Sequence, residues 1–333
     1  MNLKRSQLRQ DLVSGDWIVI APGRAKRPYE IIKKAEKRKI PSRRSCPFEN
    51  PQKSGHGYPV LSYGSDGDWE LQVIENKYPA FVHQKICSDL MKSGPYFITE
   101  ANGHQDLVIT KDHQKTLAEV SLREAQQVFE SFRDRYLMFI NDPCLAYVSI
   151  FHNWGPKAGA SVYHPHYQIA AIPVVPPDIQ HSLNGSAKYF KENKKCVHCV
   201  MMDLELRHRK RVIYQNEGAV VFAPFVSKEP FEFRVFPKKH LPYFENTLDT
   251  DLDYVVEALQ KSLKKMKKNL KDPDYNFFIH TAPIKDKDKE KHLHYHWHVE
   301  VLPKVTIRAG FELGTGVTIN VVDPDEAAAL LRK

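Results

Sequence analysis

Two long segments of the chain place apolar residues at helical spacing. In the first, Ser121 and Glu124 form the pattern of a capping box. Its apolar positions are Leu122, Val128, Phe129, Phe132 and Tyr136. The second has apolar positions at Leu252, Val255, Val256, Leu259, Leu263, Met266 and Leu270. Both segments stop at an Asp-Pro pair, so the sequence predicts two helices with the same ending.

The segments around these two helices are also similar. An apolar run ending in histidine precedes each helix, "DLVITKDH" and "FEFRVFPKKH", and a β-rich run follows each, "AYVSIFHN" and "YNFFIHTAP". Further on, "HPHYQIAAIP" and "HYHWHVEVLP" align from proline to proline, and upstream of the two helices lie "CPFEN" with Cys46 and "CVHC" with Cys196 and Cys199. We interpret this as one ancestral unit present twice, at roughly 46–175 and 196–305.

The repeat predicts an α+β fold. Each unit should form antiparallel strands with a packed helix, and the two should merge around a shared sheet or half-barrel. We divide the chain into a first unit at 1–175, a linker at 176–195 rich in Pro, Asn, Ser and Lys, and a second unit at 196–333. The charged run 285–291 should be a solvent-exposed loop.

Composition narrows the class of protein. The chain has 333 residues and ordinary globular proportions of charged and apolar residues, with no run of about 18 apolar residues and no apolar core near the N-terminus. We therefore expect a cytoplasmic protein with no membrane partner. Five cysteines argue against a disulfide framework. The net charge of +9 lies in clusters without interleaved stacking aromatics, which argues against a nucleic-acid partner.

The stretch 161–173, "SVYHPHYQIAAIP", brings three polar side chains together. In a strand, His164, His166 and Gln168 would point to the same face. Pro165 lacks the amide proton of a central ladder, so the histidines should lie at the start or the edge of a strand. A neutral imidazole of His166 could attack phosphorus, and Gln168, Ser161 and the backbone of "KAGAS" could donate to phosphoryl oxygens. A purely structural role for these residues is the alternative.

Cysteines and histidines in corresponding places of the two units predict metal sites. In the second unit, the C-x-x-C pair Cys196 and Cys199, His240 and one histidine of "HYHWH" have the proportions of a structural zinc site. The first unit offers Cys46, His113 and His164, with Glu49 where a second cysteine would stand. A carboxylate can bind Zn²⁺, so that site could be filled or empty. Buried free cysteines and core histidines are the alternative.

The string "NWGPKAGASVYHPHYQ" closely resembles the active-site motif of galactose-1-phosphate uridylyltransferases, a branch of the histidine-triad superfamily. The resemblance covers nearly the whole chain. Further family-like segments are "DLVSGDWIVIAPGRAKRP", "ENKYPAF", "DHQKTLAE", "IHTAP", "HWHVEVLP" and "FELGTGVTIN".

This resemblance implies a nucleotidyltransferase of galactose metabolism. His166 would take the uridylyl group from UDP-glucose as a covalent phosphoramidate and release glucose 1-phosphate. Galactose 1-phosphate would then attack the same phosphorus and form UDP-galactose, which is ping-pong kinetics. The partners would be a UDP-sugar and a hexose 1-phosphate.

The resemblance also implies roles for other residues. Gln168 and Ser161 would bind the transferred phosphoryl group, and His164 would orient the site or hold its metal. The arginines at positions 24 and 27 would reach substrate phosphate, in some members across the interface of a homodimer. The full set of substrate-binding residues would be Arg24, Arg27, Asn76, Asn153, Gly159, Glu312, Gly314 and Gly316. His296 would be the fourth zinc ligand of the second unit, with His280 in reserve.

Two questions stay open at this point. ADP-sugar phosphorylases transfer adenylyl groups through the same histidine; Pro165 favours the uridylyl branch without settling the base. A Zn-dependent nucleic-acid-binding protein is an alternative from another class, motivated by the charge and the C-x-x-C pair.

Within the second unit, the proline alignment puts His298 where Gln168 would be, so we expect this unit to be a scaffold that forms no nucleotidyl adduct.

Overall fold

A computed structural model describes residues 5–24, 38, 40–65, 67–284 and 291–333. Its centre is a ten-stranded sheet in the order β10-β11-β12-β14-β13-β8-β9-β7-β4-β3, with antiparallel pairing throughout. The strands of this sheet are β3 (Leu61–Ser65), β4 (Asp68–Glu75), β7 (His104–Thr110), β8 (Tyr147–Trp154), β9 (His166–Ile172), β10 (Val212–Gln215), β11 (Ala219–Phe222), β12 (Phe233–Pro237), β13 (Tyr275–His280) and β14 (His298–Pro303).

Helices and two small sheets complete the described structure. The α-helices are α2 (Leu122–Phe139), α3 (Pro177–Asn193), α4 (Val197–His208), α5 (Asp249–Asn269), α6 (Gly310–Thr315) and α7 (Pro324–Arg332). The short 3-10 helices are η1 (Arg43–Ser45), η2 (Pro156–Ala158) and η3 (Phe244–Asn246). The remaining strands are β1 (Gln7–Gln10), β2 (Trp17–Ile20), β5 (Met91–Ser93), β6 (Tyr96–Ile98) and β15 (Ile319–Asn320). None of the helices in the described part of the chain has the length and apolar character needed to cross a bilayer.

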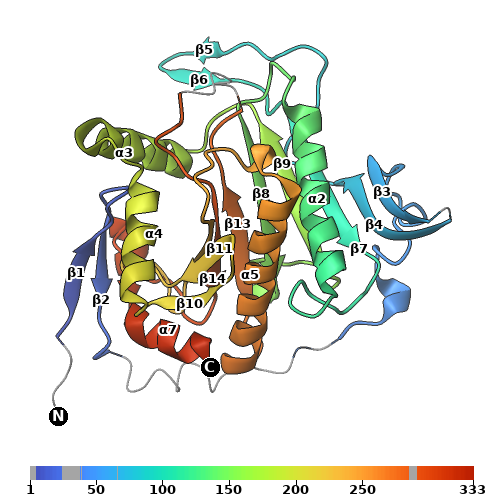
Figure 1. Cartoon of the computed structure of the whole chain (residues 1–333). Helices are drawn as coiled ribbons and strands as arrows, with labels where there is room; N and C mark the ends of the chain where they lie inside the picture. The colour runs from blue at the N-terminus through green and yellow to red at the C-terminus, as the bar shows by residue number, and fades with distance from the viewer. Residues whose placement is uncertain (1–4, 25–37, 39, 66, 285–290) are drawn as a thin grey trace.

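The large sheet confirms the expected α+β fold of two merged units. Its halves repeat one order of five strands, β3-β4-β7-β9-β8 and β10-β11-β12-β14-β13. The halves meet where β8 pairs with β13, for example at Ile150 and Ile279. Helices α2 and α5 lie side by side against the same face of the sheet (Figure 1).

Packing of these two helices follows the sequence pattern. The Ser121 hydroxyl accepts from the backbone N–H of Glu124, and the Glu124 carboxylate accepts from the N–H of Ser121, so the capping box is confirmed. Every apolar position named above is buried except Leu122, which is 38% exposed in the first turn of α2. The buried stripes form one core with the sheet.

Strand alternation gives the sheet two different faces. On β9, Tyr167 and Ile169 belong to the core beneath α2 and α5. His166 and Gln168 alternate with them and therefore point to the opposite face. On β14, Val299 belongs to the same core, and His298 alternates with it. His166, Gln168 and His298 thus lie on the sheet face away from the two long helices.

Two sequence-based expectations need correction. Most of the segment 176–195, interpreted as a linker, is helix α3, because Ile179 and Leu183 form a buried stripe against Tyr147 and Tyr295. Ile179 and Leu183 are four residues apart, as in a helix, but the Pro, Ser and Lys residues around them indicated a linker. Cys87 and Cys144 form a disulfide, although the odd number of cysteines argued against one.

The two ends of the described chain meet in a small sheet. Strand β2 pairs with β1 on one side and, in parallel, with β15 on the other. Residues 7–20 therefore pack with the C-terminal segment of the second unit. The division at 1–175, 176–195 and 196–333 stays a prediction. The charged run at 285–291 lies outside the described residues except for its last position.

Loss of a buried leucine of α5 should destabilise the protein strongly. Leu259 is fully buried, so Leu259→Ala should lower the free energy of unfolding by about 2–5 kcal/mol through lost burial and a residual cavity. Leu137→Ala is the matched control, since Leu137 lies in α2 and is 44% exposed; its effect should be about 0.5 kcal/mol or less. Urea unfolding measures both, and equal losses would contradict the described packing.

Candidate active site

The two histidines of the HPH motif lie where β9 begins. His166 is the first residue of the strand, and Pro165 directly precedes it, so the proline removes no hydrogen bond from the ladder. The prediction of a strand start is confirmed; β9 is an inner strand, flanked by β7 and β8. Both imidazoles contact the ring of Phe48, with centroids 5.8 Å (His164) and 5.1 Å (His166) away. They therefore point to the same side.

Backbone carbonyls fix which ring nitrogen of each histidine carries a proton. A carbonyl oxygen only accepts, so the 2.9 Å contact between His166 Nδ1 and the carbonyl of His164 requires a proton on Nδ1. The lone pair of the neutral ring is then on Nε2. Burial lowers the pKa of His166, which keeps the ring neutral near pH 7. The His166 carbonyl in turn accepts from Nδ1 of the buried His152 at 2.7 Å.

A chain of amide hydrogen bonds orients Gln168. The backbone N–H of Ala80 can only donate, and it lies 2.7 Å from Oε1 of Gln105. Nε2 of Gln105 therefore faces Oε1 of Gln168, at 3.2 Å. This leaves the NH₂ group of Gln168 free to donate to a ligand beside His166. The sequence did not indicate Gln105, because its role depends on strand pairing between β7 and β9.

The loop before the HPH motif is held by the second unit. Backbone N–H of Lys157 donates to the Asp274 carboxylate at 2.7 Å, next to Gly155, where a β-carbon would come within 2.3 Å of that carboxylate. Asn276 donates to the carbonyl of Ala158 at 2.8 Å, which fixes the orientation of its amide. The same NH₂ group donates to Oδ1 of Asn153, also at 2.8 Å, so the NH₂ of Asn153 stays free. Asp274 and Asn276 were not identified from the sequence.

The four predicted metal ligands of the first unit come together. Cys46, Glu49, His113 and His164 each offer one ligand atom, all within 4.8 Å of one another. Nδ1 of His164 lies 3.5 Å from Sγ of Cys46, and Nδ1 of His113 lies 2.9 Å from Oε1 of Glu49. The Nε2 atoms of the two histidines face the carbonyls of Thr110 and Pro41, so each Nδ1 is unprotonated and available to a metal.

The second unit has the same arrangement. The ligand atoms of Cys196, Cys199, His240 and His296 also lie within 4.8 Å of one another. Sγ of Cys199 is 3.2 Å from Nδ1 of His240 and 3.4 Å from Nδ1 of His296. Nε2 of His240 donates to the carbonyl of Leu293, which again leaves Nδ1 for a metal. Two sulfurs and two correctly oriented imidazoles fit a zinc ion. His280 does not join this cluster.

The two ligand sets show which residues of the two units correspond, and this correspondence differs from the proline-to-proline alignment of the sequence. His164 corresponds to His296, each two residues before the first residue of its strand, His166 or His298. Nδ1 of His298 lies 3.1 Å from the carbonyl of His296, as Nδ1 of His166 does from that of His164. The proline-to-proline alignment was therefore wrong by two residues. His298 corresponds to His166 and not to Gln168.

The residue of the second unit that corresponds to Gln168 is Glu300. Its carboxylate forms ion pairs with Arg234 at 3.2 Å and with His280 at 3.5 Å. Burial disfavours the charged form of Glu300, but Arg234 and His280 outweigh it and lower its pKa to about 2. Arg234 also pairs with the buried Glu232 at 3.0 Å. The second unit thus has a histidine beside a buried ion-pair network, without a free amide donor.

The other predicted substrate-binding residues lie on exposed or half-buried segments. Arg24 is exposed on the turn after β2, Ser161 is exposed before β9, and Arg27 lies outside the described residues. Asn76 follows β4, and its N–H donates to the carbonyl of Gln105. Gly159 ends η2 with a positive φ of 86°, and Glu312, Gly314 and Gly316 belong to or end α6.

A neutral histidine with a free Nε2 beside a free amide donor, at the start of an inner strand of a duplicated α+β unit, defines a nucleotidyltransferase of the histidine-triad class. Comparison with known proteins supports this class. The family described as "Domain of unknown function (DUF4921)" matches residues 87–332. ADP-glucose phosphorylase of Arabidopsis thaliana is 33% identical over 98% of this chain and 92% of its own. Galactose-1-phosphate uridylyltransferase of Thermotoga maritima is 27% identical over 98% of each chain.

Solved structures show the same fold. The crystal structure of the Arabidopsis thaliana ADP-glucose phosphorylase with bound ADP-glucose has a TM-score of 0.81 and 29% identity, over 99% of each chain. A uridylyltransferase structure, at 24% identity and a TM-score of 0.74, covers 98% of this chain and 97% of its own. The chain belongs to the DUF4921 family and is related to ADP-glucose phosphorylase and to galactose-1-phosphate uridylyltransferases, as the HPH motif indicated. This membership favours nucleotidyl transfer over the nucleic-acid-binding alternative.

Proposed function

We propose that this protein transfers a nucleotidyl group between hexose 1-phosphates through a covalent intermediate on His166. The observation that supports this most directly is the proton on Nδ1 of His166, held by the His164 carbonyl, which leaves Nε2 as the nucleophile. Nε2 would attack the α-phosphorus of a nucleotide sugar, form an N–P bond and displace the hexose 1-phosphate. The phosphate oxygen of the acceptor would then attack the same phosphorus and break the N–P bond.

The rest of the site would stabilise charge on the phosphoryl group. The free NH₂ of Gln168 is a donor at the position where negative charge develops, and exposed Ser161 offers a second one. The free NH₂ of Asn153 would contact the nucleotide side, together with Asn76. Helix α6, with Glu312, Gly314 and the C-cap Gly316, would approach the sugar phosphate from the second unit, because glycines allow close backbone approach. No general base is required, since the acceptor phosphate is already anionic.

UDP-glucose as donor and galactose 1-phosphate as acceptor are our leading assignment, supported by Pro165 of the HPH motif and by the uridylyltransferase relatives. A second candidate is an ADP-sugar phosphorylase, which would use the same histidine with inorganic phosphate as acceptor. The relative at 33% identity is an ADP-glucose phosphorylase, and this observation favours the second candidate. The two differ only in the base of the donor and in the acceptor.

Zinc is the metal we assign to both ligand clusters. Bound Zn²⁺ would supply structural cross-linking, in keeping with four protein ligands and no open position. In the first unit, Cys46, Glu49, His113 and His164 would hold it, so the metal would fix His164, whose carbonyl orients His166. The second cluster would anchor the start of α4 to β14.

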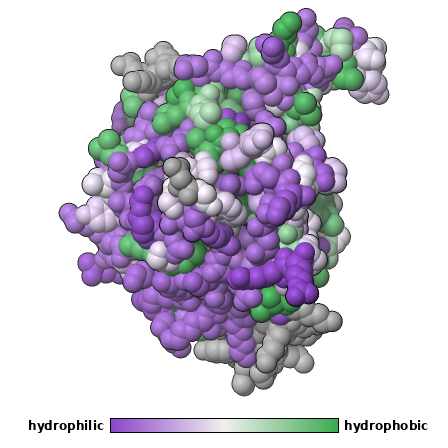
Figure 2. Space-filling model, turned by 90° about the vertical axis from the view of Figure 1, so that its right-hand side faces the viewer, coloured by the Kyte–Doolittle hydropathy of each residue, from purple (hydrophilic) through white to green (hydrophobic). Residues whose placement is uncertain are grey.

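We further propose that the protein is a homodimer. An apolar hairpin, defined here as β5 and β6 with Leu90, extends from the body at the top of Figure 1, and Figure 2 shows apolar side chains near the top of the molecule. Leu90, Met91, Tyr96, Phe97 and Ile98 are each at least 54% exposed. A second copy would cover this surface. Arg24 would then be free to reach the partner's substrate phosphate.

Incubation with the true donor should add one nucleoside monophosphate to the protein. UDP-glucose and ADP-glucose are each added without acceptor, and the intact mass is measured. Adduct formation with one of them identifies the base. His166→Gly should give no adduct because it removes the attacking nitrogen, whereas His181→Gly, at an exposed position of α3, should behave as wild type. Overall transfer retained by a folded His166→Gly variant would overturn the assignment of the nucleophile.

The second unit should form no adduct of its own. The Nδ1 atom of His298 faces the carbonyl of His296, as Nδ1 of His166 faces that of His164. However, the anionic Glu300 replaces Gln168 and would repel a phosphoryl group. With excess donor and no acceptor, we expect at most one nucleotide per chain, on the peptide that contains His166. Two nucleotides per chain, or a label on residues 291–303, would show that both units are catalytic.

Elemental analysis should detect zinc in the purified protein. Cys199→Ser should lose about one Zn²⁺ per chain because it removes one of four ligands from the second cluster. Cys46→Ser tests the first cluster in the same way. His208→Asn is the control, since His208 is exposed at the end of α4 and belongs to none of the ligand clusters, and its metal content should match the wild type. Unchanged zinc in Cys199→Ser would contradict the ligand set.

A further inference from the structure

A third group of metal-ligand side chains lies on the other face of the sheet. His83, His104 and Asp142 offer ligand atoms within 4.8 Å of one another. His104 is on β7 and contacts Phe139 of α2 with ring centroids 4.8 Å apart, whereas its neighbour Gln105 faces the catalytic site. The group therefore belongs to neither of the clusters described above.

The spacing of the ligand atoms suits an ion better than direct hydrogen bonds. Nδ1 of His83 and Nε2 of His104 lie 3.9 and 4.0 Å from the same oxygen, Oδ2 of Asp142. These distances are too long for hydrogen bonds. Bonds of about 2.0–2.2 Å in a tetrahedral geometry would separate ligand atoms by roughly 3.3 Å, so a small closure brings all three onto one ion. The two imidazoles are stacked, with centroids 4.4 Å apart.

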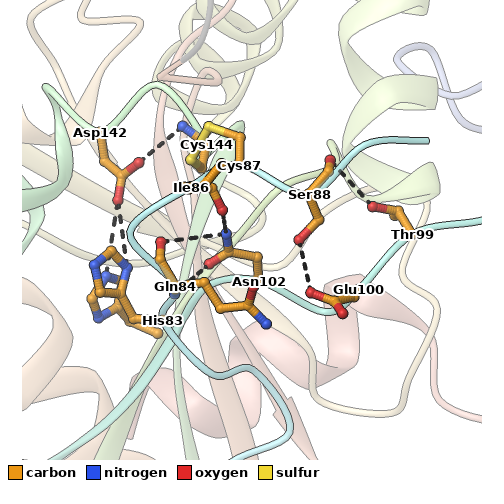
Figure 3. The surroundings of a disulfide bond; sticks show 11 residues. His83, Gln84, Ile86, Cys87, Ser88, Thr99, Glu100, Asn102, Asp142 and Cys144 are labelled. Atoms are coloured by element: carbon orange, nitrogen blue, oxygen red, sulfur yellow. Dashed lines mark hydrogen bonds and ion pairs between the residues drawn. A yellow bond between two sulfur atoms is a disulfide. The ribbon is translucent and has the colours of Figure 1, made fainter.

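The three side chains are already held in place by their own segments. Figure 3 shows the loop that carries His83 joined to the turn that carries Asp142 by the disulfide Cys87–Cys144. The buried Asn102 accepts from the N–H of Gln84 and donates to the carbonyl of Ile86, which fixes the loop from its other side. Oδ1 of Asp142 accepts from the N–H of Cys144 at 2.9 Å and leaves Oδ2 for a ligand. Binding would therefore need little ordering.

The charges nearby are compatible with a bound cation. Arg135 is close to His104, but its charge is balanced by Asp106, with Nε 2.7 Å from Oδ2. The side chain of His83 is 46% exposed, whereas those of His104 and Asp142 are 16% and 17% exposed. Solvent can thus reach a fourth coordination position.

We propose that His83, His104 and Asp142 form a third metal site, which takes a divalent transition-metal ion of the Zn²⁺ class with water as a fourth ligand. Two imidazoles and one carboxylate are ligands that Zn²⁺ accepts. The ion ties the segment after Val82, the start of β7 and the turn after α2 into one unit. Ala80, on the same segment, donates to Gln105, so the site supports the side of the sheet that carries Gln168.

Zinc uptake by wild type and ligand variants tests this site. The metal content of purified protein is measured first, and Zn²⁺ is then titrated in competition with a fluorescent indicator. His83→Asn should weaken binding of one added Zn²⁺ by at least about 10-fold, the smallest loss typical even for an outer partner of a metal site. His83 is half-exposed, so the variant should fold. His104→Gln is the second variant, and His208→Asn, at an exposed position of α4, is the control.

Co²⁺ distinguishes this site from the two cysteine clusters. An ion on His83, His104 and Asp142 has no sulfur ligand, so the Co²⁺ that His83→Asn loses should lack a thiolate charge-transfer band. Equal uptake by folded wild type, His83→Asn and His104→Gln would overturn the proposal. So would an added ion that carries the thiolate band and is lost in Cys46→Ser, since that ion would occupy the first cluster.

Discussion

Hydrogen bonds from imidazole rings to backbone carbonyls are the interactions on which the site depends. The His164 ring donates through Nε2 to Thr110 and keeps Nδ1 for the metal cluster, whereas the His166 ring donates through Nδ1 to His164 and keeps Nε2 for chemistry. The two neighbouring histidines thus have opposite tautomers and different tasks. Because the carbonyls belong to Thr110 at the end of β7 and to His164, two residues before β9, the backbone itself selects the tautomers. A shift of register between these strands would remove the distinction.

The seam between β8 and β13 explains why the first unit needs the second. Asp274 and Asn276 bind the backbone of the loop at 155–161, and Asn276 also orients Asn153. Both residues lie at the edge of the second unit that pairs with β8. A single unit would lack these partners, so its phosphoryl-binding loop would be poorly ordered. Duplication therefore supplies a support for the site as well as a larger shared core.

Sequence patterns predicted the features that depend on local spacing. The capping box at Ser121, the buried stripes of α2 and α5, and the two sets of four metal ligands all follow from short periodicities or repeated segments. Features set by tertiary contacts were missed. Gln105 has a role only because β7 pairs with β9, and Cys87 meets Cys144 only because the loop after β4 returns to the end of α2. Alignment by proline failed because the prolines mark strand ends, whereas the histidines mark strand starts.

Electrostatics, more than backbone geometry, distinguishes the first unit from the second. The hydrogen bond from His166 to the His164 carbonyl is 2.9 Å long, and the corresponding bond from His298 to His296 is 3.1 Å long. In both units, one ligand of the metal cluster lies two residues before the start of the strand. The difference is the residue two positions after the strand start, a neutral Gln168 in one unit and an ionised Glu300 in the other. An amide can donate to a phosphoryl oxygen, whereas a carboxylate repels it. Arg234 does not restore an anion site, because the ionised Glu300 forms an ion pair with it. In the proposed assignment, one change of side-chain charge, retained inside an ion-pair network, therefore turns a duplicated catalytic unit into a structural one.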